Sequence, residues 1–281
     1  MSAPLHLERR GAGEGLLMLH GYSMTGRSLL PLAEAFAGEY EVLVPDLPGH
    51  GASSAVVARE GYDFDACVDD VLGTMESAGH ARCHAFGYSM GARIALACAL
   101  RCPGAFASLV LLAGRAGIAD AAERKLRRAA DNAVAARIER DGPEPFVDDW
   151  MALPLFETQW RLGPKFIDAV RRERLSNSAE GLAGALRAMG PAAQPPLFDA
   201  LGSLDLPVLC MAGALDTKFV EAGRDLAARL PRGEFVEIPD AGHAAHTEQP
   251  AAVIAAMKDF LRRAAAPAHT TGTRNALEGA R

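Results

Sequence analysis

The chain has 281 residues, about twice the length of a typical single domain. Hydrophobic residues make up 49% and charged residues 23% of the sequence, proportions that indicate a globular protein rather than a disordered one. The 29 basic and 35 acidic side chains give a net charge of -6, so no overall positive field attracts nucleic acid or an anionic membrane.

Apolar, β-rich runs alternate with helical patterns in the first 115 residues. The runs predicted to be strands are 16–20, 41–46, 82–88 and 108–113. Apolar residues recur every three to four positions in the segments predicted to be helices, which are 28–36, 63–78 and 90–100. The alternation resumes with strands at 207–212 and 234–238 and helices at 220–230 and 250–263. This order predicts an α/β fold with a doubly wound, mostly parallel sheet.

Residues 115–200 interrupt the alternation and contain no convincing strand. We interpret them as a helical cap inserted into a core formed by 1–114 and 201–265. Glycine-proline pairs divide this cap into several short helices. The pairs are Gly142-Pro143, Gly163-Pro164 and Gly190-Pro191. Residues 266–281 are small and polar without periodicity, and they are predicted to form a flexible tail.

Several classes of protein are disfavoured by what the sequence lacks. The longest run without a charged residue is 102–114, far short of the roughly 20 residues of a membrane span. The first ten residues show no apolar signal core. The five cysteines are odd in number and include no C-x-x-C pair, so neither a disulfide framework nor a zinc site is indicated. We expect a cytoplasmic protein without a membrane span, either a monomer or a small homo-oligomer.

The sequence Gly87-Tyr88-Ser89-Met90-Gly91 lies where a predicted strand ends and a predicted helix begins. In that context G-x-S-x-G indicates a nucleophile elbow, a tight turn that lifts the serine hydroxyl above the edge of the sheet. The glycines are needed because the strand and helix backbones pass close together. An ordinary strand–helix turn is the alternative, and the surrounding pattern favours the elbow.

A serine hydroxyl becomes reactive when a histidine takes its proton and a carboxylate orients that histidine. The expected chain order is serine, acid, histidine. Asp216 and His243 each follow a late predicted strand, at the sheet edge where such folds place their ligands. His246 is a rival to His243, whereas Asp46 precedes the serine and is interpreted as structural.

A second feature of such a site is a pair of backbone N–H groups that stabilise negative charge on an oxygen. The segment Leu19-His20-Gly21-Tyr22 follows the first long strand, so the N–H groups of Tyr22 and Met90 are predicted to form this oxyanion hole. His20 and His50 are interpreted as residues that brace loops. No motif for a metal site or a phosphate-binding loop is present.

Arginines recur around this predicted site. Arg93 lies one helical turn after Ser89, so its side chain can reach the site. Two further clusters occupy the predicted cap: Arg124, Lys125, Arg127 and Arg128 in one helix, and Arg171, Arg172 and Arg174 in another. Because the guanidinium fork binds carboxylates in bidentate fashion, these arginines indicate an anionic substrate with more than one carboxylate.

The sequence resembles the α/β-hydrolase-fold 2-succinyl-6-hydroxy-2,4-cyclohexadiene-1-carboxylate synthases of menaquinone biosynthesis over about residues 16–261. LHGY, DLPGHG and GYSMG are shared with many hydrolases. More particular to these synthases are the arginine directly after the elbow (GYSMGAR), DDWMALPLF at 148–156, RERLSNSAEGLAGALRAMGPAAQP at 172–195, LDTKF at 215–219 and AGHAAHTEQP at 241–250. Ala92 departs from the glycine usual in the family, and its methyl group could tighten packing near Arg93.

The resemblance implies specific roles for residues of this chain. Ser89, Asp216 and His243 would form the catalytic triad. Carboxylate-binding positions fall on Arg93, Arg127 and Arg174, and Arg128 could replace Arg127 because the register of that cluster is ambiguous. Family pocket residues correspond to Tyr88, Trp150 and Phe156.

The implied activity is that of a lyase. The triad would act as a base that removes a proton beside the succinyl ketone, and the oxyanion hole would hold the enolate. Pyruvate would then be eliminated from 2-succinyl-5-enolpyruvyl-6-hydroxy-3-cyclohexene-1-carboxylate, a small-molecule polycarboxylate, without a cofactor or metal. Two alternatives remain: a serine hydrolase of a carboxylated ester or C–C bond substrate, and a ligand-binding receptor that retains the fold.

Overall fold

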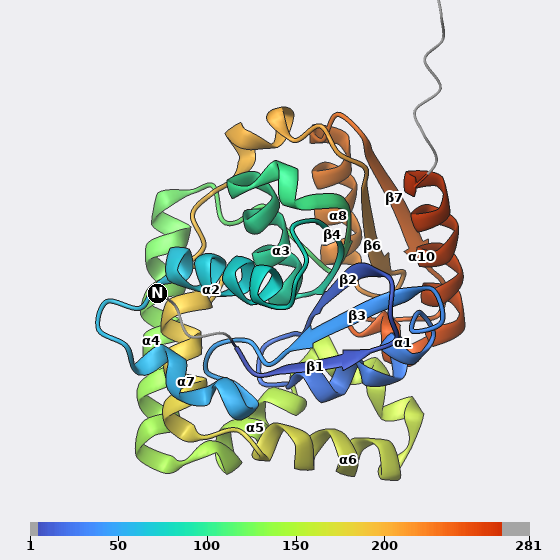
Figure 1. Cartoon of the computed structure of the whole chain (residues 1–281). Helices are drawn as coiled ribbons and strands as arrows, with labels where there is room; N and C mark the ends of the chain where they lie inside the picture. Colours follow the sequence, from blue (N-terminus) through green and yellow to red (C-terminus); the bar gives the residue numbers. More distant parts are fainter. Residues whose placement is uncertain (1–4, 266–281) are drawn as a thin grey trace, which may run out of the picture.

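Seven strands of the described chain form one sheet in the order β1-β3-β2-β4-β5-β6-β7 (Figure 1). The structure is a computed structural model that describes residues 5–265, and the segment 266–281, predicted to be a flexible tail, lies outside the described residues. The strands are β1 (Leu7–Arg10), β2 (Glu14–Leu19), β3 (Tyr40–Pro45), β4 (Cys83–Tyr88), β5 (Phe106–Leu112), β6 (Val208–Gly213) and β7 (Gly233–Ile238). All neighbours pair in parallel except β1, which is antiparallel to β3.

Helices cover both faces of the sheet, as a parallel sheet requires. The core helices are α1 (Leu30–Glu34), α2 (Phe64–Ser77), α3 (Met90–Arg101), α8 (Thr217–Arg229), α9 (Ala245–Glu248) and α10 (Pro250–Ala265). Short 3-10 helices occupy η1 (Gly26–Leu29), η2 (Gly51–Ala58), η3 (Pro103–Ala105) and η5 (Phe198–Ser203). Helices α2 and α3 lie on one face of the sheet, and α1 and α10 lie on the other (Figure 1).

The two faces of strand β2 show how the sequence divides the core. Because successive side chains of a strand point to opposite faces, Leu17 and Leu19 join the cluster that packs on α2 and α3. Leu16 and Met18 join the cluster on α1 and α10. All four side chains are fully buried, so the apolar run at 15–19 is a central strand covered on both sides. The sequence prediction of a doubly wound, mostly parallel sheet is thus confirmed.

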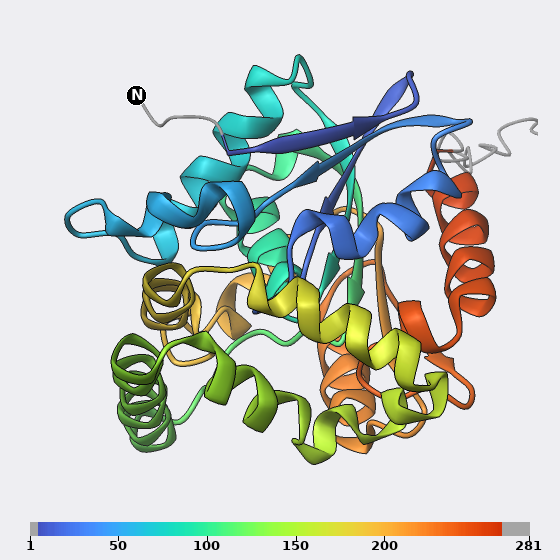
Figure 2. The same cartoon turned by 90° about the horizontal axis from the view of Figure 1, so that it is seen from below.

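A helical segment is inserted between β5 and β6. It contains α4 (Ala121–Asp141), α5 (Pro143–Met151), the 3-10 helix η4 (Pro154–Leu162), α6 (Pro164–Leu175) and α7 (Ala179–Met189). These inserted helices lie together on one side of the molecule (Figures 1 and 2). They share a separate hydrophobic cluster that includes Ile138, Phe146 and Leu182.

The glycine-proline pairs mark helix boundaries in this segment. Gly142 and Gly163 have φ angles of 82° and 85°, a left-handed conformation that glycine adopts without steric cost. Each is followed by a proline at the start of the next helix, where the missing N–H needs no partner.

Three features of the fold differ from the sequence prediction. Strand β1 was not predicted, because its four residues, LERR, carry no apolar alternation and are mostly half-buried. The predicted helix 28–36 is divided into η1 and α1. Helix α4 runs for 21 residues, longer than the short helices expected there. No helix between residues 5 and 265 combines the length and the apolar character that crossing a bilayer demands.

Candidate active site

Ser89 occupies a strained turn between β4 and α3. Its backbone has φ 52° and ψ -105°, a conformation that side-chain-bearing residues seldom adopt. Two close approaches explain the flanking glycines: a Cβ atom on Gly87 would lie 2.5 Å from the Gly91 carbonyl oxygen, and one on Gly91 would lie 2.1 Å from that of Leu19. The strand and the helix can therefore meet at this turn only if both positions are glycine.

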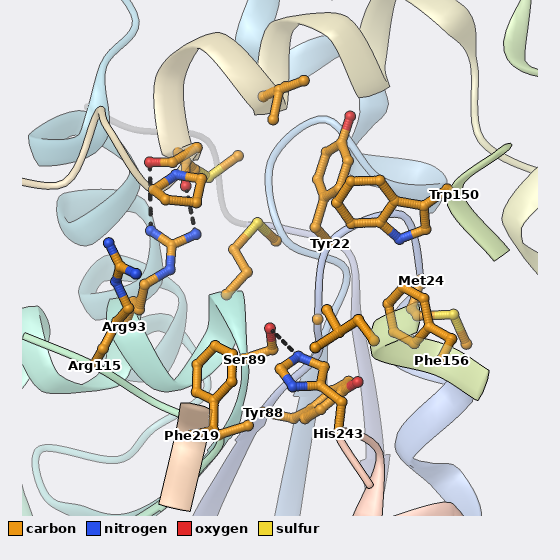
Figure 3. Close-up of a pocket in the computed structure, with 18 of the residues that line it drawn as sticks. Tyr22, Met24, Tyr88, Ser89, Arg93, Arg115, Trp150, Phe156, Phe219 and His243 are labelled. Carbon is orange, nitrogen blue, oxygen red and sulfur yellow. Dashed lines mark hydrogen bonds between the residues drawn. The ribbon is translucent and has the colours of Figure 1, made fainter. Parts of the chain in front are cut away.

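Ser89, His243 and Asp216 form a continuous hydrogen-bonded chain. The Ser89 Oγ and His243 Nε2 atoms lie 3.0 Å apart (Figure 3). On the other side of the ring, His243 Nδ1 lies 2.7 Å from Asp216 Oδ2. Asp216 follows β6 and His243 follows β7, so two neighbouring strands deliver them to the same sheet edge. An imidazole in this position can take the serine proton while the carboxylate orients the ring.

His246, the rival to His243, and Asp46, the acid that precedes Ser89 in the chain, do not line the cavity beside Ser89. His246 is buried, and its ring packs against that of Tyr88 in a tilted arrangement with centroids 4.4 Å apart. Burial and the charge of His243 lower the pKa of His246 to about 3. Asp46 accepts hydrogen bonds from the backbone N–H groups of Gly26 (2.8 Å) and Ala52 (2.9 Å), which makes it a loop-organising residue.

Tyr22 and Met90, whose backbone N–H groups were predicted to form the oxyanion hole, both line the cavity beside Ser89. Met90 is the first residue of α3, where N–H groups have no partner within the helix. Tyr22 lies in the loop after β2, and among residues 5–265 its N–H donates to no backbone carbonyl oxygen. Both N–H groups are therefore available to an oxygen atom of a bound molecule.

Two buried histidines brace the loop that carries Tyr22. His50 Nε2 accepts a hydrogen bond from the Ser23 N–H (3.1 Å), and His20 Nε2 accepts one from the Leu47 N–H (2.9 Å). Burial lowers the pKa of His20 to about 4 and that of His50 to about 3. Both rings stay neutral at pH 7 and can act as acceptors, so the loop holds its shape.

The cavity itself lies between the sheet edge and the inserted helices. Tyr88, Trp150 and Phe156, predicted as pocket residues, all line it (Figure 3). The further lining residues are Gly21, Tyr22, Met24, Ser89, Met90, Arg93, Ala113, Arg115, Arg127, Leu155, Arg174, Leu186, Met189, Gly190, Pro191, Lys218, Phe219 and His243.

One group of cations lies on the α3 side of the cavity. Arg93 is buried and donates a hydrogen bond to the Met189 carbonyl oxygen (2.8 Å). Burial and the neighbouring charges of Arg115 and Arg127 lower the pKa of Arg93 to about 9. Arg127 donates from Nε to Asp131 Oδ1 (2.7 Å) and remains partly exposed.

Arg174 supplies a cation beside Phe156, which lies on the opposite side of Ser89 from Arg93 (Figure 3). It is buried, and its guanidinium stacks on the Phe156 ring at 5.2 Å. Its Nη1 donates to the Ser23 Oγ and to the Tyr22 carbonyl oxygen (3.4 Å), while its Nε has no partner in the described chain. Burial lowers the pKa of Arg174 to about 10. Arg174 thus both braces the loop and borders the cavity.

Several other cations of the two cap clusters do not line the cavity. Arg128 donates to the Ala192 carbonyl oxygen (2.7 Å) and does not line the cavity, whereas Arg127 does. Arg124 donates to the Ile118 carbonyl oxygen (2.7 Å). Arg171 pairs with Asp148 and Glu144 on the surface.

Sequence reasoning missed two cations of the cavity, Arg115 and Lys218. Arg115 comes three residues after the end of β5, and Lys218 is the second residue after Asp216. Both residues follow the carboxyl end of a central strand, where such folds bind their ligands, and this position could have identified them in the sequence. Within residues 5–265, no group of three or more His, Cys, Asp or Glu side chains is arranged to hold a metal ion.

A parallel sheet with a strained serine after a central strand, followed by an acid and a histidine, defines the α/β-hydrolase-fold class of proteins. The comparison with protein families agrees: residues 15–250 match the alpha/beta hydrolase fold family.

Individual relatives give a more specific resemblance than the fold does. The chain is 31% identical to the 2-succinyl-6-hydroxy-2,4-cyclohexadiene-1-carboxylate synthase of Salmonella paratyphi C, covering 92% of this chain and 97% of that protein. It is 34% identical to the synthase of Serratia proteamaculans, covering 88% and 92%. The chain therefore belongs to the family of 2-succinyl-6-hydroxy-2,4-cyclohexadiene-1-carboxylate synthases, within the α/β-hydrolase fold.

Solved structures show the same relationship. MenH from S. aureus superposes with a TM-score of 0.87 at 31% identity, covering 92% of this chain and 98% of that one. A thermophilic esterase from Thermogutta terrifontis, solved with malate bound, superposes with a TM-score of 0.80, also at 31% identity, covering 92% and 93%.

Proposed function

We propose that this protein is a lyase that eliminates pyruvate from 2-succinyl-5-enolpyruvyl-6-hydroxy-3-cyclohexene-1-carboxylate to give 2-succinyl-6-hydroxy-2,4-cyclohexadiene-1-carboxylate in menaquinone biosynthesis. One observation carries the proposal: the hydrogen-bonded chain of Ser89, His243 and Asp216 opens into a cavity with buried arginines on both sides. The substrate has three carboxylates, and the family relationship supports the same reaction.

The reaction starts with removal of the proton on the ring carbon beside the succinyl ketone. His243 accepts this proton by way of the Ser89 hydroxyl, and Asp216 stabilises the resulting imidazolium. The electron pair left behind moves onto the ketone oxygen to form an enolate. As the enolate collapses, the ring double bond shifts and the C–O bond to the enolpyruvyl group breaks. The departing enolate takes up the proton held by His243 at its methylene carbon and becomes pyruvate, which returns His243 to its neutral form.

The surrounding groups stabilise charge during this sequence. The N–H groups of Tyr22 and Met90 donate to the enolate oxygen, and losing one such donor typically costs about 2.7 to 4 kcal/mol. Arg93, Arg127 and Arg174 bind the substrate carboxylates by charge-assisted hydrogen bonds. Because the elimination involves no net oxidation or reduction, it requires no cofactor.

Residues 115–200 act in this proposal as a cap on the core formed by 1–114 and 201–265. They supply Arg127 from α4, Trp150 from α5, Phe156 from η4 and Arg174 from α6. A substrate enclosed between cap and core is shielded from water, which strengthens each charge interaction.

The test is release of pyruvate from freshly prepared enolpyruvyl substrate. Spontaneous decay of that substrate without protein supplies the baseline rate. We expect addition of the purified protein to raise the rate far above this baseline, with matching growth of the absorbance of the conjugated product. A rate equal to the baseline would contradict the lyase proposal.

Hydrolysis of a carboxylated ester is a second candidate, favoured by the hydrogen bond between Ser89 and His243 and by similarity to the thermophilic esterase. In that reaction Ser89 would attack the ester carbonyl instead of relaying a proton. Rapid cleavage of 4-nitrophenyl hydrogen succinate, together with pyruvate release no faster than the spontaneous baseline, would support the hydrolase and contradict the lyase.

A further inference from the structure

Arg115 has an unusual environment for an arginine beside a cavity. It follows β5 after Ala113 and Gly114, and its side chain extends beside that of Arg93 (Figure 3). Its Nε atom is buried without a hydrogen-bond partner. No ion pair or side-chain hydrogen bond to another residue within 5–265 involves its guanidinium.

The cations around Arg115 outnumber the acids near them: the charge of Glu123 acts on Arg115, and that of Asp131 acts on Arg93 and Arg127. Burial and the charge of Arg127 lower the pKa of Arg115, and Arg93 donates only to neutral acceptors, namely the Met189 and Gly190 carbonyl oxygens and the Gln194 side chain. In this group only Arg127 has a carboxylate at hydrogen-bonding distance, that of Asp131. Buried charges in proteins are normally paired, yet neither Arg93, which is buried, nor Arg115, which is half-buried, has a carboxylate at hydrogen-bonding distance within residues 5–265.

We propose that Arg115 is a further substrate-binding residue that, together with Arg93, holds one carboxylate of the substrate. The two side chains lie side by side and both line the cavity, so a single carboxylate can accept from both. This inference extends the proposed function, because it relies on a substrate with several carboxylates.

The position of this subsite defines the class of ligand. Arg93 and Arg115 lie on one side of Ser89, whereas Phe156, on which Arg174 stacks, lies on the other (Figure 3). A molecule with carboxylates at both ends can therefore reach cations on both sides while its middle faces Ser89 and His243. The site is built for a dicarboxylate or tricarboxylate with a ketone between its charged groups.

A purely structural role for Arg115 is the competing explanation. Arg115 also borders a surface hollow lined by Glu123 and Asp225, and its carbonyl oxygen accepts a hydrogen bond from Gln194 Nε2 (3.4 Å). If Arg115 served mainly to pair with those acids, its replacement would lower the thermal stability of the ligand-free protein. If it binds the ligand, its replacement relieves repulsion with Arg93 and leaves that stability unchanged or higher.

The experiment uses calorimetric titration with 2-(3-carboxypropanoyl)benzoate, a stable aromatic dicarboxylate that resembles the proposed product. The Arg115→Gln variant is compared with the wild type and with Arg137→Gln. Arg137 has the same charge, lies in α4 and pairs with Asp149 outside the cavity. We expect Arg115→Gln to weaken binding by roughly 10- to 100-fold, the size of a charge-assisted hydrogen bond, and Arg137→Gln to leave binding unchanged.

Two results would overturn the inference: no binding by the wild type at millimolar probe, or equal affinity of wild type and Arg115→Gln. Equal affinity with a lower unfolding temperature of ligand-free Arg115→Gln would assign Arg115 the structural role instead. A pyruvate-release assay on the same wild-type protein separates the two proposals. Weakened probe binding in Arg115→Gln without pyruvate release by the wild type would contradict the lyase and retain the carboxylate subsite. Pyruvate release with unchanged probe binding would contradict the subsite alone.

Discussion

Ser89 combines a strained backbone with a hydroxyl that is hydrogen-bonded to His243. Strain of this kind costs of order 1–3 kcal/mol and persists only where the surrounding structure enforces it. Here β4 and α3 enforce it from both sides, and the Ser89 N–H is held by the Leu112 carbonyl oxygen (2.8 Å). The backbone geometry therefore does not depend on the hydroxyl, so the hydroxyl can be removed without disturbing the turn.

We expect Ser89→Ala and His243→Ala each to lower turnover by roughly 10³-fold or more, as losses of triad members do in other enzymes. The measurement is the rate of pyruvate release at saturating substrate, with circular dichroism to verify folding. Ser203→Ala, on the surface away from the cavity, is the control. Near-normal rates in both site variants would remove the proton-relay role from these residues.

Helix α3 and strand β2 approach each other so closely that a methyl group does not fit between them. A Cβ atom on Gly91 would meet the Leu19 carbonyl oxygen at 2.1 Å. Because that oxygen belongs to the backbone of a central strand, it can yield only if the sheet moves.

Gly91→Ala is expected to destabilise the protein by about 1–3 kcal/mol or more, since overpacking forces the backbone to shift. Gly73→Ala is the matched control, because Gly73 lies within α2 and its added methyl would meet nothing within 4 Å. The control should gain about 0.5–1 kcal/mol from its higher helix propensity. Urea unfolding of both variants measures these effects, and equal stabilities would contradict the packing argument.

Glu173 connects α6 of the inserted segment to the loop after β2. Its Oε1 accepts hydrogen bonds from the N–H (3.1 Å) and the Oγ (2.9 Å) of Thr25. The next residue, Arg174, bonds to Ser23 in the same loop. Burial raises the pKa of Glu173, so the carboxylate depends on these donors.

Glu173→Ala leaves the Thr25 donors unpaired, which should cost about 1–3 kcal/mol, and it releases Arg174 from its position. We expect KM to rise more than kcat falls, because substrate binding depends on Arg174 more than the proton transfer does. Steady-state kinetics test this, with Glu221→Ala on the surface of α8 as control. A fall in kcat alone, with KM unchanged, would argue against this positioning role.

Three of the histidines buried within residues 5–265, namely His20, His50 and His246, have pKa values far below the usual range. Burial is the main cause: it lowers the pKa of His20 from 6.5 to about 4, and those of His50 and His246 from 6.5 to about 3. Below pH 6.5 the unfolded chain binds protons at these positions and the folded chain does not. Stability contributed by their neutral burial is therefore present above pH 6.5 and is lost as the pH falls.

We expect each of these histidines to remove about 1 kcal/mol of stability between pH 7.5 and pH 5.5. Replacing His50 with glutamine should lower stability at neutral pH but reduce this acid-induced loss by about 1 kcal/mol. Urea unfolding at the two pH values gives the comparison, and His6→Gln in the exposed N-terminal region is the control. An unchanged acid-induced loss in His50→Gln would show that His50 does not titrate as argued.

The sequence alone was sufficient for the fold class and for the family. Alternating apolar runs and helical spacing predict the central strands and α2, α3, α8 and α10, because strand and helix periodicity depends on residues close in the chain. The elbow at Ser89 and the Gly-Pro boundaries at 142 and 163 were predicted for the same reason. Strand β1 was not predicted, because the position of a four-residue edge strand depends on pairing with its partner β3 and not on its own residue pattern.

Only the tertiary structure decided which arginines face the cavity. Arg127 and Arg128 are adjacent in α4, yet one lines the cavity and the other bonds to Ala192. Arg115 carries no motif, and it lies beside Arg93 only because β5 ends and α3 begins at the same edge of the sheet. Periodicity predicts which face of a helix is apolar, whereas the direction of a charged side chain depends on the elements packed against it, which belong to distant parts of the chain.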